Sequence, residues 1–196
     1  YSVSGGTGIN VNFSESNFLG RGQALSASVS NTTDTQNASF SFTEPALLGR
    51  DLSFTFGGFY RTSDNDNALY LTRNAGLTFG IGFPLGEQSR LDLRYRASED
   101  KLYNYTGSSS IIDAEEAQGP IVTSALGYTY EFDNRITGLN PNSSFLFRFG
   151  QEFAGLGGDA KYVSTTALAV AETKVLNEEV TLRAIFEGGA LSSLSD

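Results

Sequence analysis

Apolar and polar residues alternate one by one along much of the chain. From Leu25 to Ser30 every second residue is apolar and the others are serines, and residues 38–43 repeat the pattern with two phenylalanines. Successive side chains of a β-strand point to opposite faces, so this period of two predicts strands. A polar tip at residues 31–37 separates the two runs and predicts a hairpin. Its polar face carries small hydroxyl groups instead of Lys and Glu, which favours the inside of a barrel whose outside meets lipid.

The same alternation predicts ten strands in one domain, residues 1–196. In the clearest strand Leu77, Phe79 and Ile81 share one face, while Thr78 and glycines occupy the other. The ninth strand is the least distinct, because three alanines between residues 167 and 171 weaken the contrast between its faces. The predicted ranges are 6–16, 22–31, 37–44, 51–62, 68–83, 88–100, 120–132, 143–153, 161–175 and 179–190.

Charged residues within these strands gather on the polar face. In the sixth strand Asp92, Arg94 and Arg96 alternate with apolar residues. A membrane strand tolerates several charges on one side only where that side is wet. The predicted lumen-facing charges are Asp92, Arg94, Arg96, Arg148, Arg183 and Glu187. These arginines could line a pore, but we favour internal ion pairs with Asp92 and Glu187.

The connections between strands alternate in character. One set is mostly compact and carries Gly, Pro or Asn turn chemistry, and comprises residues 17–22, 44–51, 84–89, 133–142 and 176–179. The other set is on average longer and richer in acidic residues and Ser, and comprises residues 31–37, 62–67, 100–119 and 153–161. Strict alternation predicts an all-β, up-and-down antiparallel transmembrane barrel whose second set of loops faces outside. The longest loop could hold a short helix at residues 111–117.

The composition excludes several classes of function. The formal charge of −9 and the pI near 4.5 argue against nucleic acid as a partner, because phosphate binding depends on Lys and Arg. The chain has no Cys and no His, which excludes thiolate chemistry, a Ser-His-Asp triad and His-ligated metals. We therefore expect no enzyme active site, no cofactor and no metal. No apolar run approaches the ~18 residues of a transmembrane helix.

Two other groups of side chains are candidate functional sites. The first comprises the acidic loop residues Asp64, Asp66, Asp113, Glu115, Glu116 and Asp159, which we interpret as a solvated surface in preference to a divalent-cation site. The second comprises Tyr60, Tyr95, Tyr103, Tyr105, Tyr128 and Tyr130, placed near predicted strand ends. Tyrosines at such positions are typical of an interfacial girdle, and core packing in a soluble barrel is the alternative.

Several turns resemble those of a known family. The run Asn17-Phe18-Leu19-Gly20-Arg21-Gly22 resembles the Asn-aromatic-Leu-Gly-any-Gly turn of the BamA family of outer-membrane barrel assembly factors. The agreement continues through Thr43-Glu44-Pro45, through Gly82-Phe83-Pro84-Leu85 and through the turn with Asp133, Arg135 and Pro141. The resulting periplasmic turn motif comprises Asn17, Phe18, Leu19, Gly20, Gly22, Glu44, Pro45 and Pro84. Residues 17–22 could dock periplasmic domains, but we favour a tight turn that depends on Gly20 and Gly22.

The resemblance implies a role in folding and inserting β-barrel proteins into the Gram-negative outer membrane, without an energy cofactor. It implies as partners the outer-membrane lipoproteins of the assembly machinery, client barrel proteins, the lipid bilayer and lipopolysaccharide. It also implies that the chain covers strands 2 to 11 of a barrel of roughly sixteen strands. The family's soluble periplasmic domains, its sixth extracellular loop, which the inner-face arginines could bind, and its last strands would then lie outside this sequence.

The ends of such a sheet need partners in a membrane. An open edge strand would leave on the order of ten backbone groups unpaired, each costing several kcal/mol in hydrocarbon. The remaining strands could lie in residues outside this sequence, the ten strands could close on themselves, or another chain could pair with the edges; we favour the first. With no initiating Met and no signal peptide, we expect the chain to be a mature excerpt.

Two other functions fit the pattern. One is a translocation pore of the same superfamily, which would secrete a specific client. The other is a soluble ligand-binding β-barrel. That barrel would turn its apolar residues inward around a small ligand and its Ser, Thr, Arg and Asp outward, so the direction of the apolar face discriminates it from a membrane barrel.

Overall fold

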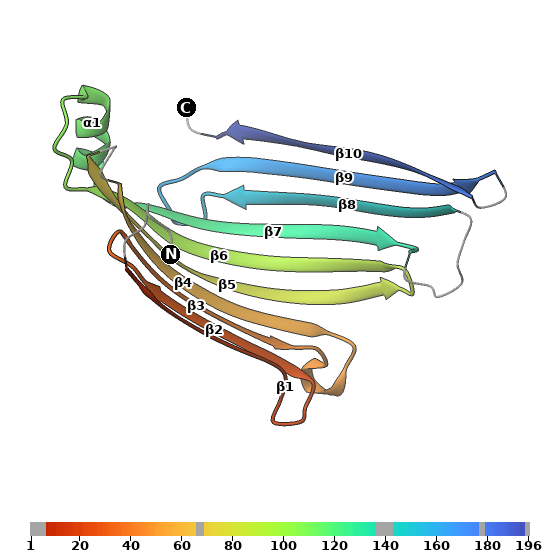
Figure 1. Ribbon diagram of the computed structural model, residues 1–196. Coiled ribbons are helices and arrows are strands. Elements are labelled where there is room, and N and C mark those ends of the chain that lie inside the picture. The colour runs from red at the N-terminus through yellow and green to blue at the C-terminus, as the bar shows by residue number, and fades with distance from the viewer. Residues whose placement is uncertain (1–6, 66–68, 136–142, 177–178, 195–196) are drawn as a thin grey trace.

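The computed structural model describes residues 7–65, 69–135, 143–176 and 179–194. Ten antiparallel strands form one sheet, in which each strand pairs with the next along the chain (Figure 1). They are β1 (Ile9–Phe18), β2 (Gln23–Asn31), β3 (Thr35–Glu44), β4 (Ser53–Asn65), β5 (Tyr70–Gly86), β6 (Ser89–Tyr103), β7 (Ile121–Asp133), β8 (Ser143–Ala154), β9 (Tyr162–Val175) and β10 (Val180–Ser193). The prediction of ten strands in an up-and-down order is confirmed. The predicted first residues of the first and fifth strands, 6 and 68, lie outside the described residues.

The strand register gathers the apolar positions on one face. Phe42 lies opposite Phe56, and Phe56 lies opposite Phe79 on the next strand. The ring centroids of Phe56 and Phe79 are 4.9 Å apart, and those of Phe40 and Phe56 are 5.9 Å apart. A slip of one residue would move every side chain to the other face, so this apolar row helps to set the register.

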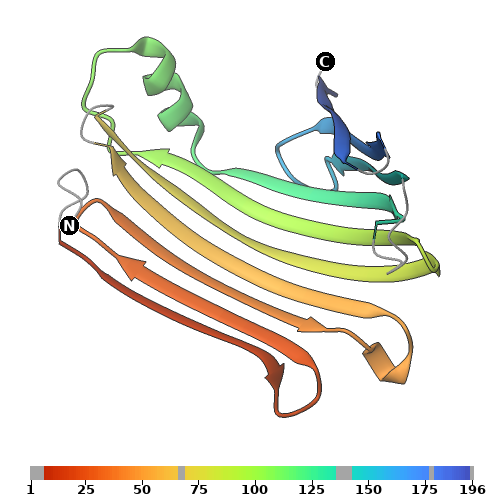
Figure 2. The ribbon, with the colours of Figure 1, turned by 45° about the vertical axis from the view of Figure 1, so that its right-hand side comes forward.

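The polar face is the concave one. The sheet is curled rather than flat (Figure 2). Among the described residues, the buried apolar side chains all occupy register positions on the polar face; they are Ala125, Leu146, Ala154 and Val170. On the apolar face even large side chains remain open, with Phe79 40% and Leu77 47% exposed. Side chains crowd on the inside of a curve and spread on its outside, so the apolar face is convex.

The register settles the faces of β9. Its three alanines, Ala167, Ala169 and Ala171, lie opposite Phe149, Phe147 and Phe145 of β8. Small side chains therefore stand beside large ones on the convex face. The alternating residues of β9, which include Val170 and Glu172, point to the concave face.

The two ends of the sheet differ. One end carries the connections β1–β2, β3–β4, β5–β6, β7–β8 and β9–β10, and includes the 3-10 turn η1 (Leu47–Gly49). The other end carries α1 (Ser110–Gln118) in the connection from β6 to β7, which confirms the predicted helix. No helix in the described parts of the chain is long and apolar enough to span a membrane.

The sheet has two edges. Within the described ranges β1 pairs only with β2, and β10 pairs only with β9. The strands therefore form a curved wall and not a closed barrel in this structure (Figure 2).

Candidate functional site

A network of four polar side chains occupies the concave face. The guanidinium of Arg96 donates from Nη2 to Glu152 Oε1 at 2.7 Å and to Tyr162 Oη at 2.6 Å. Tyr162 in turn donates to Glu152 Oε1 at 2.8 Å, and Arg94 Nε lies 3.4 Å from Glu152 Oε2. The Glu152 side chain is only 14% exposed. The network ties β6 to β8 and β9, and two cations compensate its one carboxylate.

A glycine makes room for the arginines of this network. Arg94 Nη1 donates to Thr129 Oγ1 at 2.9 Å. A Cβ atom added to Gly127, directly opposite Arg94, would lie 3.1 Å from Nε and 3.2 Å from Cζ of that arginine. A glycine inside a strand often marks such a close approach. Gly127 therefore lets the guanidinium lie against the β7 backbone.

Three further ion pairs lie on the same face. They join Arg148 Nε to Glu131 Oε2 at 2.7 Å, Arg183 Nε to Glu172 Oε1 at 3.1 Å, and Arg90 Nε to Asp92 Oδ1 at 2.8 Å. The first two cross between neighbouring strands, and the third lies within β6. Their arginines are about half exposed, so each pair contributes at most about 1 kcal/mol.

The register puts all six charges predicted to face the lumen on the concave face, where Arg94, Glu152 and Gly127 share one row across the strands. Whether that face lines a lumen stays a prediction. The residues concerned are Asp92, Arg94, Arg96, Arg148, Arg183 and Glu187.

The expected ion partners of these arginines were wrong. Asp92 pairs with Arg90, and Glu187 forms no ion pair with any residue that the structure describes. Arg148 and Glu187 share a row, but Leu168 of β9 lies between them. Two strand spacings amount to about 10 Å, and a leucine occupies the intervening position where Gly127 leaves room between Arg94 and Glu152. Arg148 and Arg183 pair instead with carboxylates one strand away, and Arg94 and Arg96 pair with Glu152 two strands away, across Gly127.

The sequence interpretation missed those carboxylates. The partners are Glu131, Glu152 and Glu172. Each stands at a polar-face position of its own strand, so counting positions by twos from the nearest strand arginine would have found Glu152, four residues after Arg148. Tyr162 carries no such signal, since its role depends on a contact across the strands.

Two predicted turn motifs meet in space. The Asn17 side chain accepts a hydrogen bond from Gly22 N at 2.7 Å, and Gly22 has a φ of 71°, a conformation that favours glycine. Next to it, Gln23 Nε2 donates to Glu44 Oε2 at 2.5 Å, and Pro45 lies beside Gly22. These contacts hold the first turn against the β3–β4 connection.

The other members of the turn motif lie differently. Leu19 and Gly20 have φ values of 55° and 70°, and the Leu19 side chain is 73% exposed. Phe18 is the last residue of β1. Pro84 pairs with Arg90 at the turn end of β5, where the β5–β6 register becomes irregular. It lies two strands away from Glu44. Whether this surface binds a partner stays a prediction.

The β7–β8 connection begins with an ion pair between Asp133 and Arg135. Arg135 donates from Nη2 to Asp133 Oδ2 at 2.7 Å and from Nε to Asp133 Oδ1 at 2.9 Å. The hydrogen bonds that Arg135 donates to the Asp133 carboxylate raise the pKa of the Arg135 guanidinium above its ordinary value. Pro141, the third member of the predicted motif, lies outside the described residues.

The predicted tyrosine girdle fits the structure only partly. Tyr95 and Tyr128 lie in the middle of β6 and β7 and not near strand ends. The hydroxyl groups of Tyr95 and Ser124 form a hydrogen bond of 2.9 Å. Tyr128 Oη donates a hydrogen bond to Gln151 Oε1 at 2.7 Å. Tyr60 and Tyr103 do lie toward the α1 end of their strands.

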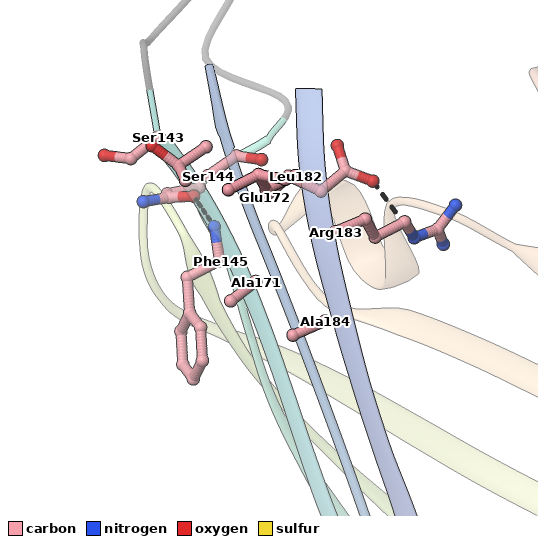
Figure 3. A pocket seen from close by; sticks show the side chains of 10 residues that line it. Ser143, Ser144, Phe145, Ala171, Glu172, Leu182, Arg183 and Ala184 are labelled. Carbon is pink, nitrogen blue, oxygen red and sulfur yellow. Dashed lines mark hydrogen bonds and ion pairs between the residues drawn. The ribbon is translucent and has the colours of Figure 1, made fainter. Parts of the chain in front are cut away.

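A hollow of about 410 Å³ lies at the turn end of β8, β9 and β10 (Figure 3). Ala171 and Ala184 provide small side chains beside Phe145, whose backbone N–H donates to Asn134 Oδ1 at 2.6 Å. The Arg183–Glu172 pair also lines the hollow, but it projects from the opposite face of the sheet to Phe145 (Figure 3). No group of three or more potential metal ligands occurs in the parts of the chain that the structure covers.

Comparison with known proteins gives relatives with the same architecture. The chain is 25% identical over 201 residues to the outer membrane protein assembly factor BamA of Neorickettsia risticii (strain Illinois), covering 99% of this chain and 27% of that protein. It is 26% identical over 161 residues to a SAM50-like protein of Drosophila melanogaster, covering 77% of this chain and 35% of that protein. The chain thus spans about a quarter to a third of the length of these curated relatives.

A solved structure shows the same fold. The crystal structure of BamA from Haemophilus ducreyi lacking POTRA domains 1–3 matches with a TM-score of 0.73 and 20% identity, covering 95% of this chain and 38% of that one. The resemblance to BamA that the turn motifs indicated is confirmed. The Omp85 superfamily domain matches residues 17–196. The chain belongs to the Omp85 superfamily.

Proposed function

We propose that this chain is part of the wall of an outer-membrane assembly factor that folds and inserts β-barrel proteins into the Gram-negative outer membrane. The proposal is supported by the relative that bears the name of an assembly factor and matches 99% of the chain. It is also supported by the fold, which is that of a BamA barrel. The proposed location is the outer membrane.

The observation that carries the proposal is the direction of the two faces. The convex face is mainly apolar and exposed, and the concave face holds the ion pairs of Glu131, Glu152 and Glu172. A convex apolar surface of this extent suits contact with lipid. A soluble ligand-binding barrel requires the opposite arrangement, with apolar side chains inward, so that alternative is contradicted.

The proposed mechanism uses strand edges and no cofactor. An edge strand in hydrocarbon lowers the free energy of the system when its backbone N–H and C=O groups find partners. A seam in the complete barrel would let a client strand pair by β-strand addition. The proposed partners are outer-membrane lipoproteins of the same machinery, client barrel proteins, the bilayer and lipopolysaccharide. No enzymatic step is needed, because hydrogen bonding and apolar burial of the client drive insertion.

A translocation pore remains the second candidate. The polar concave face would suit the wall of a water-filled channel. Such a pore would pass one specific client across the membrane and would leave the assembly of other barrels unchanged.

Depletion of the full-length polypeptide from its own cells distinguishes the two. Quantitative mass spectrometry of the outer-membrane fraction should show a joint loss of many unrelated barrel proteins. Re-expression of the wild-type polypeptide should restore them. If the barrels keep their levels while one secreted protein accumulates inside the cell, the assembly function is refuted and the pore is supported.

A further inference from the structure

Two cations face each other on the convex side, near the α1 end of the sheet. Arg73 of β5 lies directly opposite Lys101 of β6. Arg73 has the same parity as Leu77 and Phe79, so both cations project from the lipid-facing surface. Like charges directly opposite each other across two strands are destabilising. This cost calls for an anion beside the pair.

The chain supplies only part of the negative charge that the two cations require. Glu99 accepts from Arg73 Nη2 at 2.5 Å, and both side chains are 38% exposed. Lys101 forms no ion pair within the described residues, and its Nζ lies 5.9 Å from the centroid of the Tyr103 ring. One carboxylate thus serves two cations. Asp64 is opposite Leu71, one row further out and on the far side of β5 from Lys101.

The depth of the pair indicates where the missing anion comes from. The apolar run on this face of β5 extends from Ala75 to Phe83 and is centred on Phe79. Arg73 is six residues from Phe79, about 20 Å along a strand, or about 14 Å in depth for a strand tilted by ~45°. Half of a hydrocarbon core is about 15 Å. The pair therefore stands at the boundary where lipid phosphates lie.

Neighbouring side chains agree with this depth. Tyr60 lies opposite Ala75, one row from Arg73 toward the apolar run of β5, and is 42% exposed. Tyr103 lies in the row beyond, on the same face as Lys101. Tyrosines concentrate at the level of the lipid headgroups. The two cations are thus bracketed by side chains typical of the interface.

From these observations we infer that Arg73 and Lys101 form a binding site for the phosphate group of an anionic lipid in the leaflet at the α1 end. A phosphate monoester, with a charge of about −1.5 to −2, matches the pair better than a neutral or zwitterionic headgroup. Arg73 offers a fork of N–H donors, and Lys101 offers an ammonium that is free to turn toward the phosphate. The site rests on the convex face meeting lipid and not on the identity of any client.

Native mass spectrometry of the full-length polypeptide in a mild detergent tests the site. Phosphatidic acid serves as the phosphate monoester probe and phosphatidylcholine as the zwitterionic one. We expect R73Q/K101Q to weaken phosphatidic acid binding by about tenfold or more, in line with the loss of charge-assisted hydrogen bonds. The charge-preserving variant R73K/K101R should retain most of the binding.

Two further variants separate a site from a general charge effect. R21Q/R50Q removes two positive charges from the turn end of the sheet and should leave binding unchanged. E99Q removes the carboxylate that competes for Arg73 and should strengthen binding, which a merely structural role of Arg73 does not predict. Circular dichroism and thermal unfolding should show that R73Q/K101Q folds normally, because it relieves repulsion.

Three outcomes would overturn the inference. R73Q/K101Q could bind phosphatidic acid as tightly as the wild type, or phosphatidylcholine could bind equally well. Displacement of the lipid by an equal concentration of inorganic phosphate would assign the site to a soluble anion. Because lipid binding is measured without any client, a failed lipid site and a failed assembly function give different results.

Discussion

At the scale of single residues, the concave face is organised by carboxylates that pair with arginines one or two strands away. Glu152 is the most connected of them, because it accepts hydrogen bonds from Arg96 and Tyr162 and pairs with Arg94. Removing one partner of a half-buried ion pair costs more than the pair contributes, since the remaining charges stay desolvated.

Glu152→Gln should therefore destabilise the sheet. We expect a loss of about 1–3 kcal/mol in the free energy of unfolding, because Arg94 and Arg96 lose their shared carboxylate. Urea unfolding of the full chain in lipid vesicles measures this free energy. Glu187→Gln is the matched control, since that exposed carboxylate on the same face pairs with no described residue and its loss should change little. Equal effects of both substitutions would contradict the role of Glu152.

The first turn depends on a backbone conformation that suits glycine. Gly22 has a φ of 71°, and a Cβ atom there would meet nothing closer than Pro45 at 3.9 Å. Gly22→Ala should thus cost about 1–2 kcal/mol through backbone strain alone. Gly188→Ala, at a position without positive φ and with a nearest contact of 3.8 Å, should cost less than about 0.5 kcal/mol. Thermal unfolding of both variants in the same lipid compares them, and similar losses would rule out strain as the cause.

At the scale of elements, strands hold the structure and α1 adds little. No residue of α1 is buried. Its connection is ordered chiefly by its own contacts, in which Ser109 N donates to Tyr105 Oη at 2.7 Å and Tyr105 N donates to Glu116 Oε1 at 3.4 Å. The β6–β7 pairing, by contrast, is continuous from Asp100 to Ser89.

Replacing residues 108–118 with a short Gly-Ser linker should leave the sheet intact. We expect the free energy of unfolding to change by less than about 1 kcal/mol, because lengthening or shortening a surface loop has a small entropic cost. Hydrogen exchange of the β6 and β7 amides should stay slow. Fast exchange there would show that α1 protects the end of the sheet.

At the scale of the whole molecule, the two faces meet different solvents. Adjacent residues of one strand test this directly. Phe40 lies on the convex face and is 41% exposed, while Ser41 lies on the concave face opposite Ser26 and Gly57. Because they are neighbours in β3, they share the same depth and the same strand environment.

Phe40→Arg should be far more harmful than Ser41→Arg. An arginine on the lipid face near the midplane costs about 2–4 kcal/mol, whereas the same residue on a wet face costs less than about 1 kcal/mol. Reversible unfolding of each variant in lipid vesicles measures the difference. A larger loss for Ser41→Arg would reverse the assignment of the faces.

Much of the fold was predictable from local pattern. Period-two alternation placed all ten strands with bounds within three residues of those observed, because each strand has one lipid-facing and one polar side. The short helix was also predictable. The faces of β9 were not, since Ala167, Ala169 and Ala171 are compatible with either environment and take their face from the phenylalanines of β8.

The candidate site was predictable only in part. The arginines were found from their positions on the polar face, but their partners were not, because an ion pair depends on which residues the register puts opposite. Glu187 has the right face and charge, but Leu168 of β9 stands between it and Arg148. Arg73 and Lys101 are 28 positions apart in the sequence and become one cation pair only through the β5–β6 register.

The sequence by itself determined the strand positions, their amphipathic character, the alternation of the turns and the family resemblance. These features depend on residues that are close along the chain, where a period of two or a turn glycine acts locally. Only the tertiary structure decided that the polar face is concave, which carboxylates serve which arginines, and that the turns at Asn17 and Glu44 touch. Those features depend on register and curvature, which arise from pairing between strands and from the crowding of side chains on the inner face.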